Sequence, residues 1–572
     1  MRSAQLSRSL TIFVATLSFL CTLPANRVFA QVNVLNWHND NGHTGQNLQE
    51  TILTPANVNT TKFGKLFSYL VDGMMYAQPL YVQGITINGT SHNVVFAATE
   101  NDSVYAFDAD SASLNPNPLW KTSLLSANVT AMPCTDNDPY CNVYPVIGIT
   151  GTPVINLANQ SMYLVARTKE KGPKGGVLYA TRLHAINITT GAEQPNSPVL
   201  ICAAAAAKGC NFAPYTQLTQ QFVPQHQMQR PALVLTPYAG TQQGVVYLAF
   251  GQDRGWIFAY DAQTMKLLAV FCSAPNVQLS GHGLSGFWGS GGAVAADSLG
   301  NLYAATADGV FDADSGGSDY GDTVIKLTLN YDSVAQKYSF QVADYFSPTD
   351  QTCRYDNDDD LGSGAPMILP PQLGSNPDLL LMAGKGYPCD GVISPVYLIN
   401  RDNMGQAAGS TIQTVEGPQA GYWGGGAYWQ SATTTYVYYS GMASETAPPA
   451  GDNLRAFTMV SGMFSPVTAV AQSPKKLFIG STPSVSANGT TNGIVWAISR
   501  QDPLSQKPGS HPAILYAFDA SNVAHQLYSS TTNPTRDTAG AGVKFVAPAI
   551  ANGKVYVGTQ TELDVYGLLG TK

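Results

Sequence analysis

Residues 104–111 read VYAFDADS, an apolar and aromatic run that ends in acidic and small residues. Such a run predicts a β-strand followed by a turn. The same pattern returns as LHAINITTG (183–191), IFAYDAQT (257–264), VIKLTLNY (324–331), VYLINRDNMG (396–405), LRAFTMVSG (454–462), LYAFDASN (515–522) and LDVYGLLG (563–570). Most copies follow another strand-like run across a short link rich in Gly, Asn or Asp, as VVFAATE (94–100) precedes the first. Each copy therefore predicts a hairpin.

These hairpins and a further strand make units that repeat every 48 to 79 residues, a pattern typical of β-propeller blades. We predict an all-β fold, with residues 31–572 forming a single eight-bladed β-propeller. Seven blades are the main alternative, and an array of β-sandwiches or small domains is the other reading. The last unit stops at GLLGTK, whereas KLFSYLVDG (65–73) is a spare strand near the N-terminus. Added to the last blade, that strand would close the ring.

The N-terminus has the features of a signal peptide spanning residues 1–30. MRSAQLSRSL carries positive charge, TIFVATLSFLCTL is apolar, and small residues precede Gln31. We therefore expect an exported protein that is periplasmic, secreted or on the cell surface, with no transmembrane segment after signal removal. The formal net charge is -8 and no basic stripe is present, which argues against nucleic acid as a partner.

Cysteine spacing predicts disulfides, which an exported chain permits. The short loops CTDNDPYC and CAAAAAKGC suggest the pairs Cys134–Cys141 and Cys202–Cys210, and Cys353–Cys389 is a looser pairing. An odd number of cysteines follows the signal peptide, so one thiol should stay free, and Cys272 is the candidate.

Helices should be few, because strand and turn patterns occupy most of the chain. Pro- and Gly-rich segments such as 125–147 and 347–364 predict loops between blades, and such loops commonly carry the functional site. His38 and His43 in NWHNDNGHTG have no acidic partner pattern, so we expect hydrogen-bonded surface residues there.

The repeats resemble those of the pyrroloquinoline quinone (PQQ) dehydrogenases, the eight-bladed quinoprotein alcohol dehydrogenase superfamily. The opening WHNDNGHTGQNLQETILTPANVN resembles the N-terminal entry of that superfamily. Runs such as YAQPLYV, GITGTPVI, GGSDYGD and ANGKVYVGTQTELDV resemble a group of exported bacterial PQQ-repeat proteins. The resemblance covers the mature chain and implies PQQ and calcium as cofactors.

The resemblance also implies site residues. GFWGSGGAVAADSLGNLYAATADG (286–309) places Trp288 and Gly289 where the family has the tryptophan floor under the quinone, and Asp308 where an asparagine binds calcium. Asp253 in FGQDRGWIFAYDA is the nearest counterpart of the family's calcium-binding glutamate. In RYDNDDDLGSGAP, Asp358 and Asp360 are candidates for the catalytic aspartate, and Asp358 also for calcium binding.

The residues themselves leave plainer interpretations open. Trp288 is also a typical wedge between blades, and the run DNDDD (356–360) is also typical of a solvated acidic loop. The sequence departs from the family at one conspicuous feature. Adjacent cysteines form a disulfide above the quinone in the family, and no Cys-Cys pair occurs here.

Two functions therefore stand side by side. The first is a PQQ- and calcium-dependent dehydrogenase in which Asp358 or Asp360 takes the proton of an alcohol or sugar hydroxyl. The second is a cofactor-free propeller that binds a protein, glycan or cell-surface polymer through its rim. The order of Asp253, Trp288, Asp308 and the acidic run along the chain favours the first. No haem-attachment motif is present, so electrons would pass to an external acceptor.

Overall fold

The computed structural model describes residues 32–111, 113, 116–137, 141–216, 218–238, 240–277, 283–386, 395–444, 449–478, 481–500 and 511–570. The predicted all-β class is confirmed, because strands dominate and the helices are short. The helices are α1 (Gln351–Asp356), α2 (Pro534–Asp537) and the 3-10 turns η1 (Trp37–Asn39), η2 (Cys134–Asp136), η3 (Pro173–Gly175), η4 (Gly289–Gly291), η5 (Ala313–Ser315) and η6 (Leu361–Ser363). Within the described ranges, no helix has the length and apolar character needed to cross a membrane.

The first four sheets follow one another along the chain. The first contains β1 (Asn33–Val34), β4 (Leu80–Ile87), β5 (Thr90–Ala98), β6 (Ser103–Asp108) and β7 (Trp120–Ser123). The second contains β8 (Val129–Pro133), β9 (Val146–Ile147), β10 (Val154–Asn156), β11 (Ser161–Lys171), β12 (Val177–Asn187) and β13 (Val199–Ala204). The third contains β14 (Val234–Thr236), β15 (Val245–Phe250), β16 (Trp256–Asp261) and β17 (Leu267–Cys272), and the fourth β18 (Val294–Ala296), β19 (Leu302–Ala305), β20 (Val324–Asp332) and β21 (Lys337–Phe346).

The remaining four sheets include two that borrow strands from the N-terminal region. The fifth contains β22 (Met367–Ile368), β23 (Leu379–Met382), β24 (Pro395–Asn400) and β25 (Gln413–Glu416), and the sixth β26 (Ala427–Gln430), β27 (Thr435–Ser444), β28 (Ala450–Val460), β29 (Met463–Phe464) and β30 (Ala471–Leu477). The seventh contains β2 (Gln46–Asn47), β31 (Ser484–Asn488), β32 (Thr491–Arg500), β33 (Ala513–Asp519) and β34 (Asn522–Ser529). The eighth contains β35 (Ala549–Ala551), β36 (Lys554–Gly558), β37 (Glu562–Leu568) and β3 (Phe63–Leu70).

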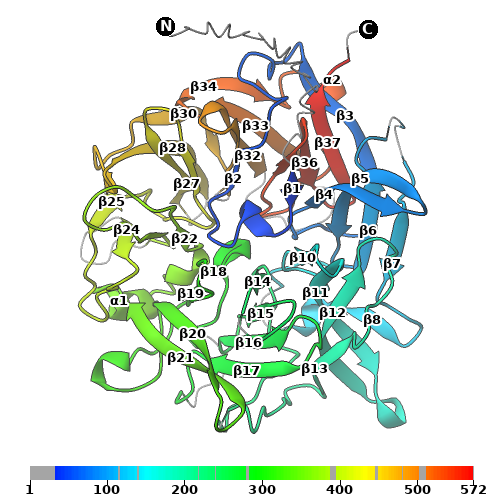
Figure 1. Ribbon diagram of the computed structural model, residues 1–572, viewed down its shortest axis with the longest axis vertical. Coiled ribbons are helices and arrows are strands. Elements are labelled where there is room, and N and C mark those ends of the chain that lie inside the picture. Colours follow the sequence, from blue (N-terminus) through cyan, green and yellow to red (C-terminus); the bar gives the residue numbers. More distant parts are fainter. Residues whose placement is uncertain are drawn as a thin grey trace, which may run out of the picture. The chain divides into compact units, whose positions relative to one another are not determined.

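Each copy of the repeated sequence pattern lies in a different sheet, on β6, β12, β16, β20, β24, β28, β33 and β37. Within residues 32–570, the sheets follow one another around a common centre (Figure 1). Short first strands of neighbouring sheets contact each other there, as β14 contacts β18 and β31 contacts β35. This arrangement explains why the pattern repeats, because each unit buries its faces against the units before and after it.

Asn-Gly turns close two of the hairpins. Asn88 and Gly89 join β4 to β5, with φ angles of 51° and 81°. Asn552 and Gly553 join β35 to β36, with φ angles of 50° and 76°. Asparagine and glycine tolerate this left-handed conformation, which the tight turns of hairpins require.

Strand β3, from the N-terminal part of the described residues, pairs with β37, from their C-terminal part. It pairs antiparallel with β37 from Phe63 opposite Leu568 to Leu70 opposite Glu562. Phe63 is fully buried and packs against Trp496 of the seventh sheet, with ring centroids 5.4 Å apart. The strand that the sequence marked as a spare is therefore the outer strand of the eighth sheet.

Two expectations about local structure are wrong. Segment 347–364 contains α1 and η6 rather than only loop, because Arg354 of α1 is buried and anchors the helix. His38 and His43 are buried rather than on the surface. Backbone carbonyls satisfy their rings: Nδ1 of His38 lies 3.0 Å from the oxygen of His43, and Nδ1 of His43 lies 3.2 Å from the oxygen of Pro366.

Candidate functional site

Three acidic side chains predicted from separate segments meet in the structure. Asp308 lies in the connection between β19 and β20, and Asp358 and Asp360 lie between α1 and η6. Asp308, Asp358 and Asp360 each offer a carboxylate oxygen, and these oxygens all lie within 4.8 Å of one another. We call them the carboxylate group. Hard oxygen ligands in this density suit a calcium ion or a similar hard cation.

Backbone hydrogen bonds hold Asp308 in place. Its own N–H donates to Oδ1 of Asp360 at 3.1 Å, and its carbonyl accepts from the N–H of Ser285 at 2.9 Å. The N–H of Ala307 donates to the carbonyl of Gly286 at 2.8 Å. The segment that carries Trp288 and the turn that carries Asp308 are thus joined directly.

Lys385 adds a positive charge that the sequence analysis missed. Its Nζ lies 2.7 Å from Oδ2 of Asp360 and 3.5 Å from Oδ1 of Asp358, and it donates to the carbonyl of Asp358 at 3.0 Å. It also lies 5.3 Å from the ring centroid of Trp423. Lys385 follows β23, and no local sequence pattern marks it, because its carboxylate partners lie in an earlier segment of the chain.

Burial and mutual repulsion separate the acidities of the group. Burial, followed by repulsion from Asp360, raises the pKa of Asp308 to about 8. Burial also opposes ionisation of Asp360, but attraction to Lys385 and the N–H of Asp308 hold the pKa of Asp360 below its ordinary value. Asp308 and Asp360 thus oppose each other's ionisation, and a bound cation would relieve that repulsion.

A further carboxyl group tests whether this region fits a cation. Asp322 is completely buried, and its Oδ1 accepts from the N–H of Leu361 at 2.9 Å. Its Oδ2 is also buried and has no hydrogen-bond partner among the described atoms. A buried carboxylate oxygen left in this state is costly unless a cation or a proton satisfies it. Burial raises the pKa of Asp322 well above its ordinary value, so a proton satisfies this oxygen, whereas the hard oxygens of Asp308, Asp358 and Asp360 fit a bound cation.

Arg354 holds the acidic loop in place through buried ion pairs and hydrogen bonds. It is 1 % exposed, and its guanidinium lies 3.0 Å from Asp350 and 3.1 Å from Asp359. It also donates to the carbonyl of Lys385 at 3.2 Å and to the hydroxyl of Tyr397 at 3.2 Å. One buried side chain therefore ties the loop of Asp358 and Asp360 to the strand end that carries Lys385.

Trp288 lies next to this loop. It precedes η4, whose Ser290 donates to the carbonyl of Ser363 in η6 at 3.0 Å. Gly289 has a φ of 53°, and a Cβ there would lie 2.6 Å from Cβ of Ala293, so glycine is required. Trp288 itself is half-buried and packs against a cluster that includes Met132, Cys134 and Tyr179. The tryptophan thus has both packing contacts and a partly free surface.

Aromatic rings and cations connect Trp288 with Lys385. The guanidinium of Arg230 lies 5.5 Å from the ring of Trp288 and 4.2 Å from the ring of Phe545. Phe545 and Trp423 are nearly parallel, at 8°, with centroids 6.5 Å apart. Lys544 lies 5.5 Å from the ring of Phe545. Burial, followed by repulsion from Arg230 and Arg500, holds the pKa of Lys544 well below its ordinary value. This surface favours a flat anion.

Asp253 takes a different position. The carboxylate group that the described residues form does not include it. Asp253 is half-buried in the turn between β15 and β16, where desolvation raises its pKa despite attraction to His226 and Arg254. The structure thus unites Asp308, Asp358 and Asp360 but leaves Asp253 outside their group.

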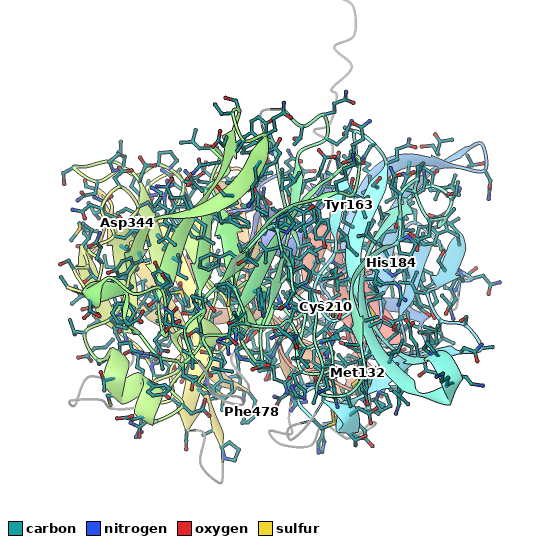
Figure 2. All side chains as sticks on the ribbon, turned by 90° about the horizontal axis from the view of Figure 1, so that it is seen from below. Met132, Tyr163, His184, Cys210, Asp344 and Phe478 are labelled. Atoms are coloured by element: carbon teal, nitrogen blue, oxygen red, sulfur yellow. A yellow bond between two sulfur atoms is a disulfide. The ribbon has the colours of Figure 1, made fainter. Side chains whose placement is uncertain are left out.

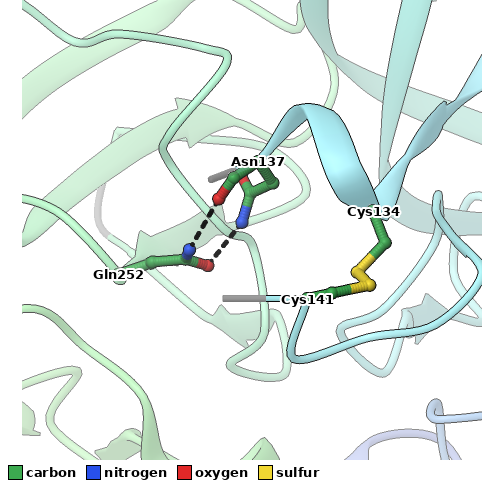
Figure 3. The surroundings of a disulfide bond; sticks show 4 residues. All are labelled: Cys134, Asn137, Cys141 and Gln252. Atoms are coloured by element: carbon green, nitrogen blue, oxygen red, sulfur yellow. Dashed lines mark hydrogen bonds between the residues drawn. A yellow bond between two sulfur atoms is a disulfide. The ribbon is translucent and has the colours of Figure 1, made fainter. Parts of the chain in front are cut away.

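The predicted disulfides Cys134–Cys141 and Cys202–Cys210 are confirmed. Figure 3 shows the first beside a pair of amide side chains: Asn137 donates to Oε1 of Gln252 at 2.6 Å, and Gln252 donates to the carbonyl of Asn137 at 3.0 Å. Cys134 and Trp288 belong to one apolar cluster, so the loop that this disulfide closes packs against Trp288, although the chain has no disulfide between adjacent cysteines.

Cys272 is free, as predicted, and it is also buried. Cys353 is disulfide-bonded, and its predicted partner Cys389 lies outside the described residues.

Glu100 provides a test of how burial changes the pKa of a carboxyl group in this protein. It is fully buried, and burial raises its pKa from 4.5 to about 7, although Oε2 accepts from the N–H of Gly148 at 2.7 Å. The unfolded chain loses this proton near pH 4.5 and the folded chain near pH 7, so the group's contribution to stability falls between those values. We expect Glu100→Gln to unfold with a free energy about 3 kcal/mol higher than wild type at pH 8, and equal at pH 4. Urea titrations at both pH values measure this difference, and a difference that does not change with pH would contradict the prediction.

No protein-family model matches the chain, and no curated protein matches it in sequence. Solved structures do match in fold. The quinohemoprotein alcohol dehydrogenase of Comamonas testosteroni matches with a TM-score of 0.53 and 15% identity, over 94% of this chain and 81% of that one. The quinohemoprotein alcohol dehydrogenase ADHIIG of Pseudomonas putida HK5 matches with a TM-score of 0.52, 15% identity and the same coverage. A europium-containing methanol dehydrogenase matches with a TM-score of 0.52 and 13% identity, over 94% of this chain and 98% of that one. The protein is thus a β-propeller with the fold of the quinoprotein alcohol dehydrogenases.

Proposed function

We propose that this chain is an exported dehydrogenase that uses PQQ and calcium to oxidise an alcohol or sugar. The eight sheets are then the blades of one ring that β3 closes. The observation that carries the proposal is the meeting of Asp308, Asp358 and Asp360 beside the turn of Trp288. A fold alone does not define an activity, so the proposal rests on this group.

The residues around Trp288 fit a flat polyanion such as PQQ, which carries three carboxylic acid groups. Arg230, Lys385 and Lys544 lie against the row of rings formed by Trp288, Phe545 and Trp423. Nη2 of Arg230 is buried and has no hydrogen-bond partner among the described atoms. A carboxylate would satisfy this donor, and the charges of Arg230 and Lys385 would offset part of the ligand's charge.

The three carboxylates take different roles in this proposal. Half-buried Asp308 and buried Asp360 act as cation ligands, whereas the side chain of Asp358 is 78% exposed and faces the entering substrate. Asp358 therefore takes the proton of the substrate hydroxyl. PQQ, held against the rings near Trp288, would supply a two-electron acceptor, and calcium, held by Asp308 and Asp360, would supply a Lewis acid. The Nζ atom of Lys385 holds the carboxylates of Asp358 and Asp360 close together.

Reconstitution tests the proposal. The purified chain is incubated with PQQ and calcium, and in parallel with PQQ and europium, because a matching fold is that of a europium-containing enzyme. We expect dye-linked oxidation of an alcohol or sugar that requires both quinone and cation. Absence of oxidation with every cation, alcohol and sugar tested would contradict the dehydrogenase and leave the rim-binding propeller as the alternative.

Trp288→Ala tests the quinone surface. We expect the mutant to bind PQQ at least about tenfold more weakly, because a stacked ring contributes on the order of 1 kcal/mol beyond its buried area. Quenching of tryptophan fluorescence during PQQ titration measures the affinity. Trp120→Ala, which removes a half-buried tryptophan from the outer strand β7, is the matched control. Unchanged affinity in Trp288→Ala would remove this residue from the quinone site.

A further inference from the structure

A separate cavity of about 340 Å³ lies between the first and second sheets. Strand β7 of the first sheet forms one wall, and β11 and β12 of the second sheet form another. Figure 2 labels His184, one of its lining residues, on the strands of the second sheet. None of its lining residues belongs to the carboxylate group or to the rings near Trp288. The volume lies in the range of small-molecule pockets.

Charged side chains in the cavity wall are paired with each other. Arg182 forms a two-pronged ion pair with Glu170, whose Oε2 lies 3.1 Å from Nη2, and Thr168 donates to Glu170 at 2.7 Å. Nδ1 of His184 lies 2.6 Å from Oε1 of Glu193. The guanidinium of Arg182 and the imidazole of His184 thus each face a carboxylate, which disfavours a charged ligand in the cavity.

Part of the lining is aliphatic. Leu124, Val129 and Pro198 contribute apolar surface, and the other residues contribute hydroxyl, carboxylate, guanidinium and imidazole groups. A hydroxyl group can accept from a guanidinium or imidazole N–H while it donates to the neighbouring carboxylate. The C–H face of a sugar ring would contact the aliphatic side. An apolar ligand would remove water from the Arg182–Glu170 and His184–Glu193 pairs without offering them a hydrogen bond, which costs free energy.

The geometry points to a second ligand site here, for a neutral, hydroxyl-rich small molecule such as a monosaccharide or polyol. A ligand in this cavity contacts strands of both sheets and therefore strengthens their association. The site is independent of the proposed dehydrogenase, since it shares no residue with it.

Ligand-observed NMR on the full chain tests this site, with methyl glucoside, xylitol and choline as probes and no PQQ present. We expect saturable binding of methyl glucoside or xylitol and none of choline. Ala166→Leu fills the cavity from β11 and should weaken binding at least about tenfold. Val129→Phe fills it from β8, in case the first variant folds poorly. Ala335→Leu, in the exposed turn between β20 and β21, is the matched control.

Three results would overturn the site. They are no saturable binding of either neutral probe, preferential binding of choline, or wild-type affinity in both filled variants. Circular dichroism and thermal unfolding confirm that the variants are folded. Because quinone-dependent oxidation is measured separately, failure here leaves the dehydrogenase proposal intact, and failure of the dehydrogenase leaves this site intact.

Discussion

Asp360→Asn is expected to weaken cation binding at least about 100-fold and to abolish quinone-dependent oxidation. Asp360 is 8% exposed and stands at the centre of the carboxylate group, where Lys385 keeps it ionised. Asparagine keeps the size of the side chain but removes the charge. Loss of residues that only support a metal ligand already costs about 10- to 100-fold in affinity, so loss of a ligand should cost more. Europium luminescence in titrations of apo-protein measures the affinity.

Asp356→Asn is the matched control, because Asp356 is an exposed acid of the same loop and changes the net charge equally. Its affinity for europium should stay within about twofold of wild type, as expected for an exposed charge. Equal loss of affinity in both variants would mean that the loop attracts cations only through its overall charge. Wild-type affinity in Asp360→Asn would remove Asp360 from the cation site.

Arg354→Ala is expected to lower the free energy of unfolding by about 3–5 kcal/mol, because it leaves the buried carboxylate of Asp359 without its cation. Asp359 is 3% exposed, so water cannot replace the lost partner. The change also frees the carbonyl of Lys385 and the hydroxyl of Tyr397 from their donor. Urea denaturation followed by tryptophan fluorescence measures the loss of stability.

Lys475→Ala, which removes an exposed cation from β30, serves as the control and should change stability by less than about 0.5 kcal/mol. Arg354→Lys should recover only part of the stability, since an ammonium group cannot repeat the two-pronged geometry of a guanidinium. Stability of Arg354→Ala within about 1 kcal/mol of wild type would show that Arg354 does not anchor the acidic loop.

The repeated pattern was sufficient to predict the all-β fold, because a strand, turn and hairpin signal is local and returns at each of β6, β16 and β33. Asp308, Asp358 and Asp360 could be proposed because their segments resemble the calcium-binding and catalytic segments of the quinoprotein dehydrogenases. Lys385 and Arg354 could not, because their roles depend on long-range contacts with no local pattern. The burial of His38 and His43 was missed for the same reason: their partners include Pro483 and Pro366, far along the chain.

The basic side chains around Phe545 could not be predicted from the sequence either. Arg230 and Lys544 are separated by most of the chain, yet both lie against the ring of Phe545. Neither belongs to a charged run, so composition gives no sign of a surface suited to a flat anion. Such residues come together only because the fold places segments that are distant in the sequence side by side.

The most direct test of the account is retention of PQQ by the purified chain. The protein is incubated with excess quinone, with calcium or with a chelator, and passed through a gel-filtration column, and quinone absorbance is measured in the protein peak. If the chain binds PQQ through calcium, the protein peak will contain about one equivalent of PQQ with calcium, and much less with the chelator or in Asp360→Asn. No quinone in the protein peak with calcium, at micromolar concentrations in the column, would contradict it.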